Sequence, residues 1–200
     1  SDRRAPKAVK NYARVNPHSM GKWSKDSKSH VATMHTGDFL NNEKSVCINN
    51  TTNVNITHHS SNGTITNLKE SINLLSKEII DSSVMSKKDL LCFLKSQIQE
   101  AKDSGILLSL HLKSTMMKVS DPIIFGHAVN IYFSDLIEKH KSTFNDLGVD
   151  FKNGFGDLID KIVHLPIEKR KEIEEDINDV FESNANLAMV NSDKGITNLH

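Results

Sequence analysis

The chain of 200 residues has few of the features that mark secreted, membrane-spanning or nucleic-acid-binding proteins. No apolar run approaches the ~20 residues that cross a bilayer, and no signal-peptide pattern opens the chain. The 25 basic and 25 acidic side chains balance, so there is no overall attraction to nucleic acid or anionic lipid. The two cysteines, Cys47 and Cys92, fall in an expected strand and an expected helix face. They favour core thiols in a reducing compartment, and we expect a cytoplasmic protein.

The first part of the chain combines a basic segment with short strands. Residues 1–40 carry many basic side chains near their start, and Pro6 is placed to open a helix. Residues 41–76 alternate apolar and polar side chains, and Asn62-Gly63 is typical of a type I′ hairpin turn. This pattern predicts a small antiparallel β meander with one solvent-facing side.

Residues 77–200 have the spacing of alternating helices and strands. A helix is expected to begin after Ser86 and to end at Gly105, because these residue types cap helices. A buried strand over 106–112 is followed by a helix over 122–139. That helix is expected to turn five side chains toward the core: Phe125, Val129, Tyr132, Phe133 and Leu136.

Two further helices lead to a last short strand. They are expected near 157–164 and from Pro166 to about Glu182, and the strand over 187–190. Strand–helix–helix–strand order predicts a parallel pair joined by right-handed crossovers. The fold class is therefore α/β: a mixed sheet with helices packed on it, together with the small antiparallel meander.

Several local patterns are better explained by structure than by ligand binding. None of the ten histidines has the helical spacing of a zinc site, and His58-His59 is expected to face solvent. His127 is expected to be a core or boundary histidine. Residues 154–156 (Gly-Phe-Gly) indicate a tight turn, and the acidic run over 172–179 is the solvent-facing side of a helix.

Several strings resemble, in the same order, those of one enzyme family. The longest is His-Leu-Lys-Ser-Thr-Met-Met-Lys-Val-Ser-Asp-Pro-Ile-Ile-Phe-Gly-His at 111–127. Others are Ser-Asp-Arg-Arg-Ala-Pro at 1–6, His-Ser-Met-Gly-Lys-Trp-Ser at 18–24 and Leu-Ala-Met-Val-Asn-Ser-Asp-Lys-Gly-Ile-Thr-Asn-Leu-His at 187–200. They resemble the monomeric NADP-dependent isocitrate dehydrogenases of bacteria. The resemblance covers the whole chain and is weakest over about 41–76 and 139–186.

This resemblance implies an activity and a place in a longer protein. Residues 1–200 would form part of an isocitrate dehydrogenase-like large domain, incomplete at both ends. The parent would be a monomer that converts isocitrate to 2-oxoglutarate and reduces NADP⁺, with Mg²⁺ or Mn²⁺ as its metal. The metal-binding aspartates and the NADP-binding groups of the family would lie outside this chain, so no residue here is assigned to either cofactor.

The resemblance also assigns two site residues. Lys113, which follows the expected strand, corresponds to the family's catalytic lysine, a proton-transfer group that works with a tyrosine absent from this chain. Arg3 corresponds to an arginine that binds isocitrate, for which its planar fork suits a carboxylate. The roles of Arg4, Asp193 and Lys194 stay open.

Two alternatives to the enzyme interpretation remain. The isolated 200 residues could be an inactive structural piece, which is compatible with an active parent. The basic start of the chain could instead be a weak polyanion-binding module, although the balanced charge disfavours this. Five basic residues would form that module: Arg3, Arg4, Lys7, Lys10 and Arg14.

Overall fold

The computed structural model describes residues 6–17, 22–110 and 120–188, and the chain divides into two units, Ser1–His30 and Val31–His200. The first unit contains helix α1 (Lys7–Val15), which begins directly after Pro6 as predicted. The proline supplies the backbone conformation of a helix start, with φ −54°. All side chains of α1 are exposed.

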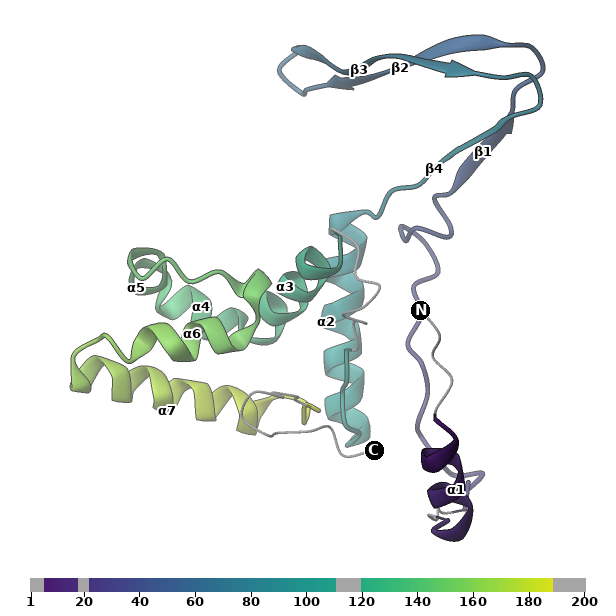
Figure 1. The fold of residues 1–200 in the computed structure, drawn as a ribbon. Coiled ribbons are helices and arrows are strands. Elements are labelled where there is room, and N and C mark those ends of the chain that lie inside the picture. The colour runs from purple at the N-terminus through teal and green to yellow at the C-terminus, as the bar shows by residue number, and fades with distance from the viewer. Residues whose placement is uncertain (1–5, 18–21, 111–119, 189–200) are drawn as a thin grey trace. The chain divides into compact units, whose positions relative to one another are not determined.

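The strands of the second unit form two antiparallel pairs (Figure 1). They are β1 (Lys44–Cys47), β2 (Thr52–His59), β3 (Ile65–Leu74) and β4 (Ile79–Ser82). β1 pairs with β4, and β2 pairs with β3, so the strands make a ribbon two strands wide instead of a meander. The antiparallel pairing was predicted, but the strands extend past residue 76.

The turn between β2 and β3 differs from the predicted type I′ turn. Gly63 N–H donates to Ser60 O over 3.0 Å, and Ser60 N–H donates to Thr64 O over 2.9 Å. Gly63 has φ +85°, whereas Asn62 has a negative φ. A type I′ turn needs a positive φ at both central residues, so this is a three-residue loop with a glycine bulge.

Helix α2 (Lys87–Ser104) has the two ends that the sequence predicts. The Ser86 side chain accepts a hydrogen bond from Asp89 N–H over 3.3 Å, and Gly105 ends the helix with φ +65°. Ser86 N–H donates to Gly37 O over 2.7 Å, which ties the helix start to the preceding segment. The buried side chains of α2 lie along one stripe of the helix: Leu90, Ile98 and Ala101.

The predicted burial of the two cysteines is wrong. Cys47 on β1 and Cys92 on α2 are both exposed. Cys47 lies on a ribbon that is solvent-exposed along most of its length. Cys92 lies on the side of α2 away from its buried stripe, so neither thiol belongs to the core.

The remaining helices enclose the apolar core. They are α3 (Ser120–Tyr132), α4 (Ser134–Lys139), α5 (Lys141–Asp146), η2 (Phe151–Asn153), α6 (Phe155–Ile162) and α7 (Ile167–Ser183). The single helix predicted over 122–139 is interrupted at Phe133. Tyr132 and Phe133, neighbours in sequence at this point, are both buried in the core, where they are 4% and 2% exposed. Phe133 stacks on Phe155 with ring centroids 4.2 Å apart.

The mixed helix-and-sheet class is confirmed, although the predicted parallel pair is short. Within the described residues it consists of one parallel bridge, between Leu108 and Leu187. The core positions expected at Val129 and Leu136 are buried, and Phe125 is partly buried. No helix in the described ranges is long and apolar enough to cross a membrane.

Candidate functional site

The residues assigned to the reacting centre lie outside the described part of the chain. Lys113, the expected catalytic lysine, falls in the segment 111–119, and Arg3, the expected isocitrate-binding residue, falls in 1–5. Three residues of open role also lie outside it: Arg4, Asp193 and Lys194. The elements that flank these segments are described, and they define where the segments join the fold.

A parallel bridge joins the short strand before residues 111–119 to the short strand before residues 189–200. Leu108 N–H donates to Asn186 O over 2.8 Å, and Ala188 N–H donates to Leu108 O over 2.9 Å. Because the strands are parallel, their carboxyl ends lie at the same edge. The segment with Lys113 follows the first strand, and residues 189–200 follow the second.

Tyr132 anchors the second of these strands to the helices. Its hydroxyl donates to Ala185 O over 2.7 Å, and Asn184 Nδ2 donates to Tyr132 O over 3.0 Å. Burial raises the pKa of Tyr132, so its hydroxyl keeps its proton as a hydrogen-bond donor. The chain that leaves α7 is therefore held against the end of α3.

Helix α3 receives the chain from the Lys113 segment and packs closely on η2. A Cβ on Gly126 would lie 3.2 Å from the backbone of Lys152, so the close approach depends on glycine. The tight turn predicted over 154–156 is confined to Gly154, which has φ +89°, because α6 already begins at Phe155. A Cβ on Gly154 would lie 3.3 Å from the ring of Phe125. These contacts hold the middle of α3 against η2 and the start of α6.

His127 on α3 lies beside two positive charges. Burial lowers the pKa of His127, and the nearby Lys87 and Lys152 lower it further. The imidazole is therefore neutral near pH 7. Its partial burial agrees with the predicted boundary position, and it belongs to no group of potential metal ligands within the described residues.

His140, which the sequence reasoning missed, is the buried polar residue of the helical core. It is 2% exposed, and its Nε2 lies 2.5 Å from Oδ2 of Asp176 on α7. The other carboxylate oxygen, Oδ1, accepts a hydrogen bond from Lys139 Nζ over 2.7 Å. The helical spacing contained a signal, because His140 follows the buried Leu136 by four residues and so lies on the same face.

His140 and Asp176 also belong to the one set of three potential metal ligands in the described part of the chain. Ligand atoms of His140, Glu172 and Asp176 all lie within 4.8 Å of one another. The Lys139 ammonium lies among them, 2.7 Å from Asp176 and 4.0 Å from Glu172. It already supplies a positive charge there, so the group is an ion-pair network that joins α4 to α7.

This network determines the ionisation of Asp176. Burial alone would raise its pKa, but hydrogen bonds and charge from Lys139 and His140 outweigh burial and lower it. The bond to Asp176 in turn raises the pKa of Lys139. The carboxylate and the ammonium are both charged near pH 7, as a structural ion pair requires.

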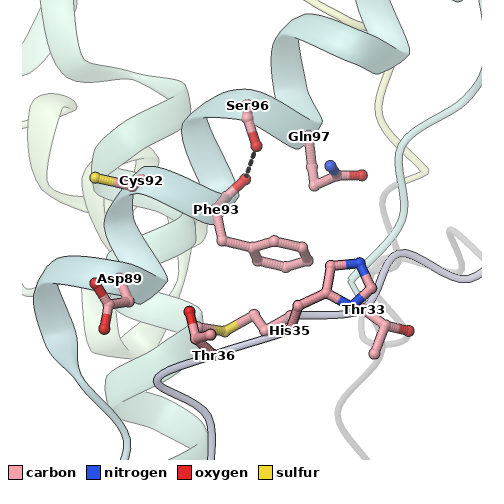
Figure 2. A pocket seen from close by; sticks show the side chains of 9 residues that line it. Thr33, His35, Thr36, Asp89, Cys92, Phe93, Ser96 and Gln97 are labelled. Carbon is pink, nitrogen blue, oxygen red and sulfur yellow. Dashed lines mark hydrogen bonds between the residues drawn. The ribbon is translucent and has the colours of Figure 1, made fainter.

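A shallow groove lies between residues 33–36 and one side of α2 (Figure 2). It has a volume of about 380 Å³ and is lined by Asp89, Cys92, Phe93, Ser96 and Gln97 from the helix. Ser96 Oγ donates to the carbonyl of Phe93 within its own helix, and Figure 2 shows Cys92 pointing away from His35. No nucleophile and base are paired across this groove.

Comparison with known proteins gives one consistent result. All 200 residues match the family described as "Monomeric isocitrate dehydrogenase". The chain is 58% identical to "Isocitrate dehydrogenase [NADP] 2" of Colwellia maris and 54% identical to "Isocitrate dehydrogenase [NADP]" of Azotobacter vinelandii. It is 50% identical to "Isocitrate dehydrogenase [NADP] 2" of Mycobacterium tuberculosis. Each match covers 100% of this chain and 27% of the relative, so the chain spans about a quarter of the relatives' length.

Proposed function

The chain belongs to the monomeric isocitrate dehydrogenase family, and we propose that, within a polypeptide of the relatives' length, it takes part in oxidising isocitrate. The products would be 2-oxoglutarate and CO₂, and NADP⁺ would be reduced. The observation that carries this proposal is the match over all 200 residues to proteins named for NADP-dependent isocitrate dehydrogenation. The chemistry of isocitrate suggests what the residues of this chain contribute.

Arg3 would bind a carboxylate of the substrate. Isocitrate carries three carboxylates, and a guanidinium group can donate two parallel hydrogen bonds to one of them. The guanidinium stays protonated at all physiological pH values and is weakly hydrated, which suits a partly desolvated anion site. Arg4, the next residue, could serve the same purpose, and comparing the two positions separates their roles.

Lys113 would transfer a proton during the reaction. Hydride leaves C2 of isocitrate, CO₂ is lost from the resulting oxalosuccinate, and the enolate that remains must be protonated. A lysine can exchange protons when partial burial lowers its pKa toward neutrality. The parallel bridge at Leu108 supports its location, because ligands in α/β sheets bind at the carboxyl ends of strands.

The described residues do not fit the expected cofactors. Mg²⁺ and Mn²⁺ prefer oxygen ligands in octahedral geometry, whereas the described three-ligand group includes His140 and already holds the Lys139 ammonium. From the family resemblance, we expect the metal ligands and the groups that bind the NADP phosphate to lie outside residues 1–200. No step of the chemistry is assigned to this network.

We further propose that the parent protein is a cytoplasmic monomer with isocitrate and 2-oxoglutarate as its small-molecule partners. The family description supports the monomer, and the balanced charge argues against nucleic-acid and membrane partners. The exposed basic side chains of α1 leave the polyanion-binding alternative testable. Salt-dependent retention on heparin would support that alternative.

The test of the proposed function is isocitrate-dependent formation of NADPH. The protein would be prepared at the relatives' full length and supplied with isocitrate, NADP⁺ and Mn²⁺. Turnover that requires isocitrate, and that Lys113→Met lowers by about 10²–10⁴-fold, is the expected result. Absence of NADPH formation by a folded, full-length protein would contradict the proposal.

A further inference from the structure

The chain contains two Asn-Gly pairs, Asn62-Gly63 and Asn153-Gly154. This dipeptide is chemically labile, because glycine has no Cβ to keep its backbone nitrogen away from the side-chain amide of the preceding asparagine. Both glycines also have a positive φ, +85° at Gly63 and +89° at Gly154. The two pairs therefore share their chemistry and differ in their surroundings in the fold.

Asn62-Gly63 lies in the exposed loop between β2 and β3. Both residues are exposed, and a Cβ on Gly63 would meet no described atom within 4 Å. Thr64 N–H donates to Asn62 Oδ1 over 3.0 Å, which folds the side-chain amide back over the peptide that follows it. The same N–H would stabilise negative charge on Oδ1 if the amide carbon were attacked. The loop thus leaves this amide open to water and holds it beside the backbone of Gly63.

Asn153-Gly154 lies in a turn that is packed against the helical core. Gly154 is buried, and a Cβ on it would lie 3.3 Å from the ring of Phe125. The Asn153 side-chain amide donates to Asp157. Gly154 N–H donates over 3.0 Å to the carbonyl of Phe151, a core residue that is 8% exposed. Rotating this peptide would disturb core packing as well as one turn, so local opening here costs more free energy than in the β2–β3 loop.

We propose that Asn62 is a site of spontaneous deamidation and that Asn153, in the same dipeptide, is protected from it by the fold. The Gly63 nitrogen gives up its proton and attacks Cγ of Asn62, which closes a cyclic imide. The side-chain nitrogen takes up a proton and leaves as ammonia. Water then opens the ring at either carbonyl and gives aspartate or isoaspartate. Position 62 gains a negative charge, and isoaspartate also lengthens the main chain within the loop. This modification goes beyond the proposed activity and does not depend on it.

The unmodified protein, at the relatives' full length, tests this proposal with its own internal control. It is incubated at mildly alkaline pH in water enriched in heavy oxygen, both natively and in denaturant, and the peptides that contain Asn62 and Asn153 are followed by mass spectrometry. Ring opening adds oxygen from the solvent, so heavy oxygen marks deamidation during the incubation, and isoaspartate marks the route through the imide. The denatured sample gives the intrinsic rate of each pair.

The two asparagines should differ strongly in the folded protein. We expect Asn62 to react natively within about tenfold of its rate in denaturant, and Asn153 to be slowed at least about tenfold more than Asn62. Asn62→Gln is the matched variant. It keeps the amide but should lose the reaction at position 62, because the longer side chain closes a less favourable ring. Equal protection of both asparagines, stronger protection of Asn62, or a product at position 62 without isoaspartate would overturn the proposal.

Discussion

The Nε2 atom of His140 lies 2.5 Å from Oδ2 of Asp176, although the two residues belong to different helical segments. His140 lies between α4 and α5, and Asp176 lies on α7. The Lys139 ammonium binds the other oxygen of the same carboxylate. One carboxylate thus joins two consecutive residues of one segment to a helix that is distant in sequence.

Replacing His140 with phenylalanine should destabilise the protein. The ring would keep most of its packing, but a partly buried carboxylate would lose one of its two donors. Hydrogen bonds to charged groups are worth about 1.5–3 kcal/mol, and we expect a loss of this size in the free energy of unfolding. Urea denaturation measures it, and His164→Phe at an exposed position is the control, with an effect within about 0.5 kcal/mol. Equal effects at the two positions would contradict a role for the His140–Asp176 contact.

The contribution of Asp176 to stability should depend on pH in the acidic range. The folded protein lowers the pKa of Asp176 below its ordinary value of 3.8, so the folded state binds its proton more weakly than the unfolded state. The stabilisation is therefore present above that value and is lost as the pH falls through the lower folded pKa. The difference in stability between wild type and Asp176→Asn should shrink below about pH 4. A difference that is constant from neutral to acidic pH would rule out this linkage.

Lys113→Met in a polypeptide of the relatives' length should lower isocitrate turnover by about 10²–10⁴-fold, because it removes a proton-transfer group. Isocitrate binding in the presence of Mn²⁺ should stay within about tenfold, since the substrate clamp is unchanged. Lys118→Met, in the same segment, is the matched control and should keep most of the activity. Turnover of the Lys113 variant within a few-fold of wild type would show that the assignment is wrong.

Arg3→Lys should mainly weaken isocitrate binding. A lysine keeps the charge but cannot donate two parallel hydrogen bonds, and the loss of a charged hydrogen bond of ~1.5–3 kcal/mol raises the KM by roughly one to two decades. Arg4→Lys provides the comparison, because the adjacent residue has no assigned role. An unchanged KM for isocitrate in the Arg3 variant, measured by steady-state kinetics, would remove Arg3 from the site.

Residues 1–200 alone should neither oxidise isocitrate nor bind NADP⁺ measurably. From the family resemblance, we expect the metal ligands, the partner tyrosine and the cofactor-phosphate groups to lie outside these residues. Without them, Arg3 cannot hold a tricarboxylate against water, and Lys113 has no activated substrate. Calorimetric titration with NADP⁺, and with isocitrate plus Mn²⁺, checks this. Saturable binding of either at micromolar concentration would mean that the site lies within this chain.

Local interactions allowed much of the helical structure to be predicted from the sequence. The cap at Ser86 and the glycine at Gly105 act on neighbouring backbone groups, so both ends of α2 were predicted correctly. The helix expected from Pro166 to about Glu182 likewise agrees with α7, which begins directly after Pro166. The family assignment also came from the sequence, because long strings in the same order do not require a structure to be compared.

Tertiary structure alone decided features that depend on distant partners. The pairing of His140 with Asp176 and the stacking of Phe133 on Phe155 each required two segments that are separate in the sequence to pack together. The exposure of Cys47 depended on whether any element covers the ribbon, which its own residues do not encode. Spacing along the chain reports which face a side chain occupies, but burial depends on what packs against that face.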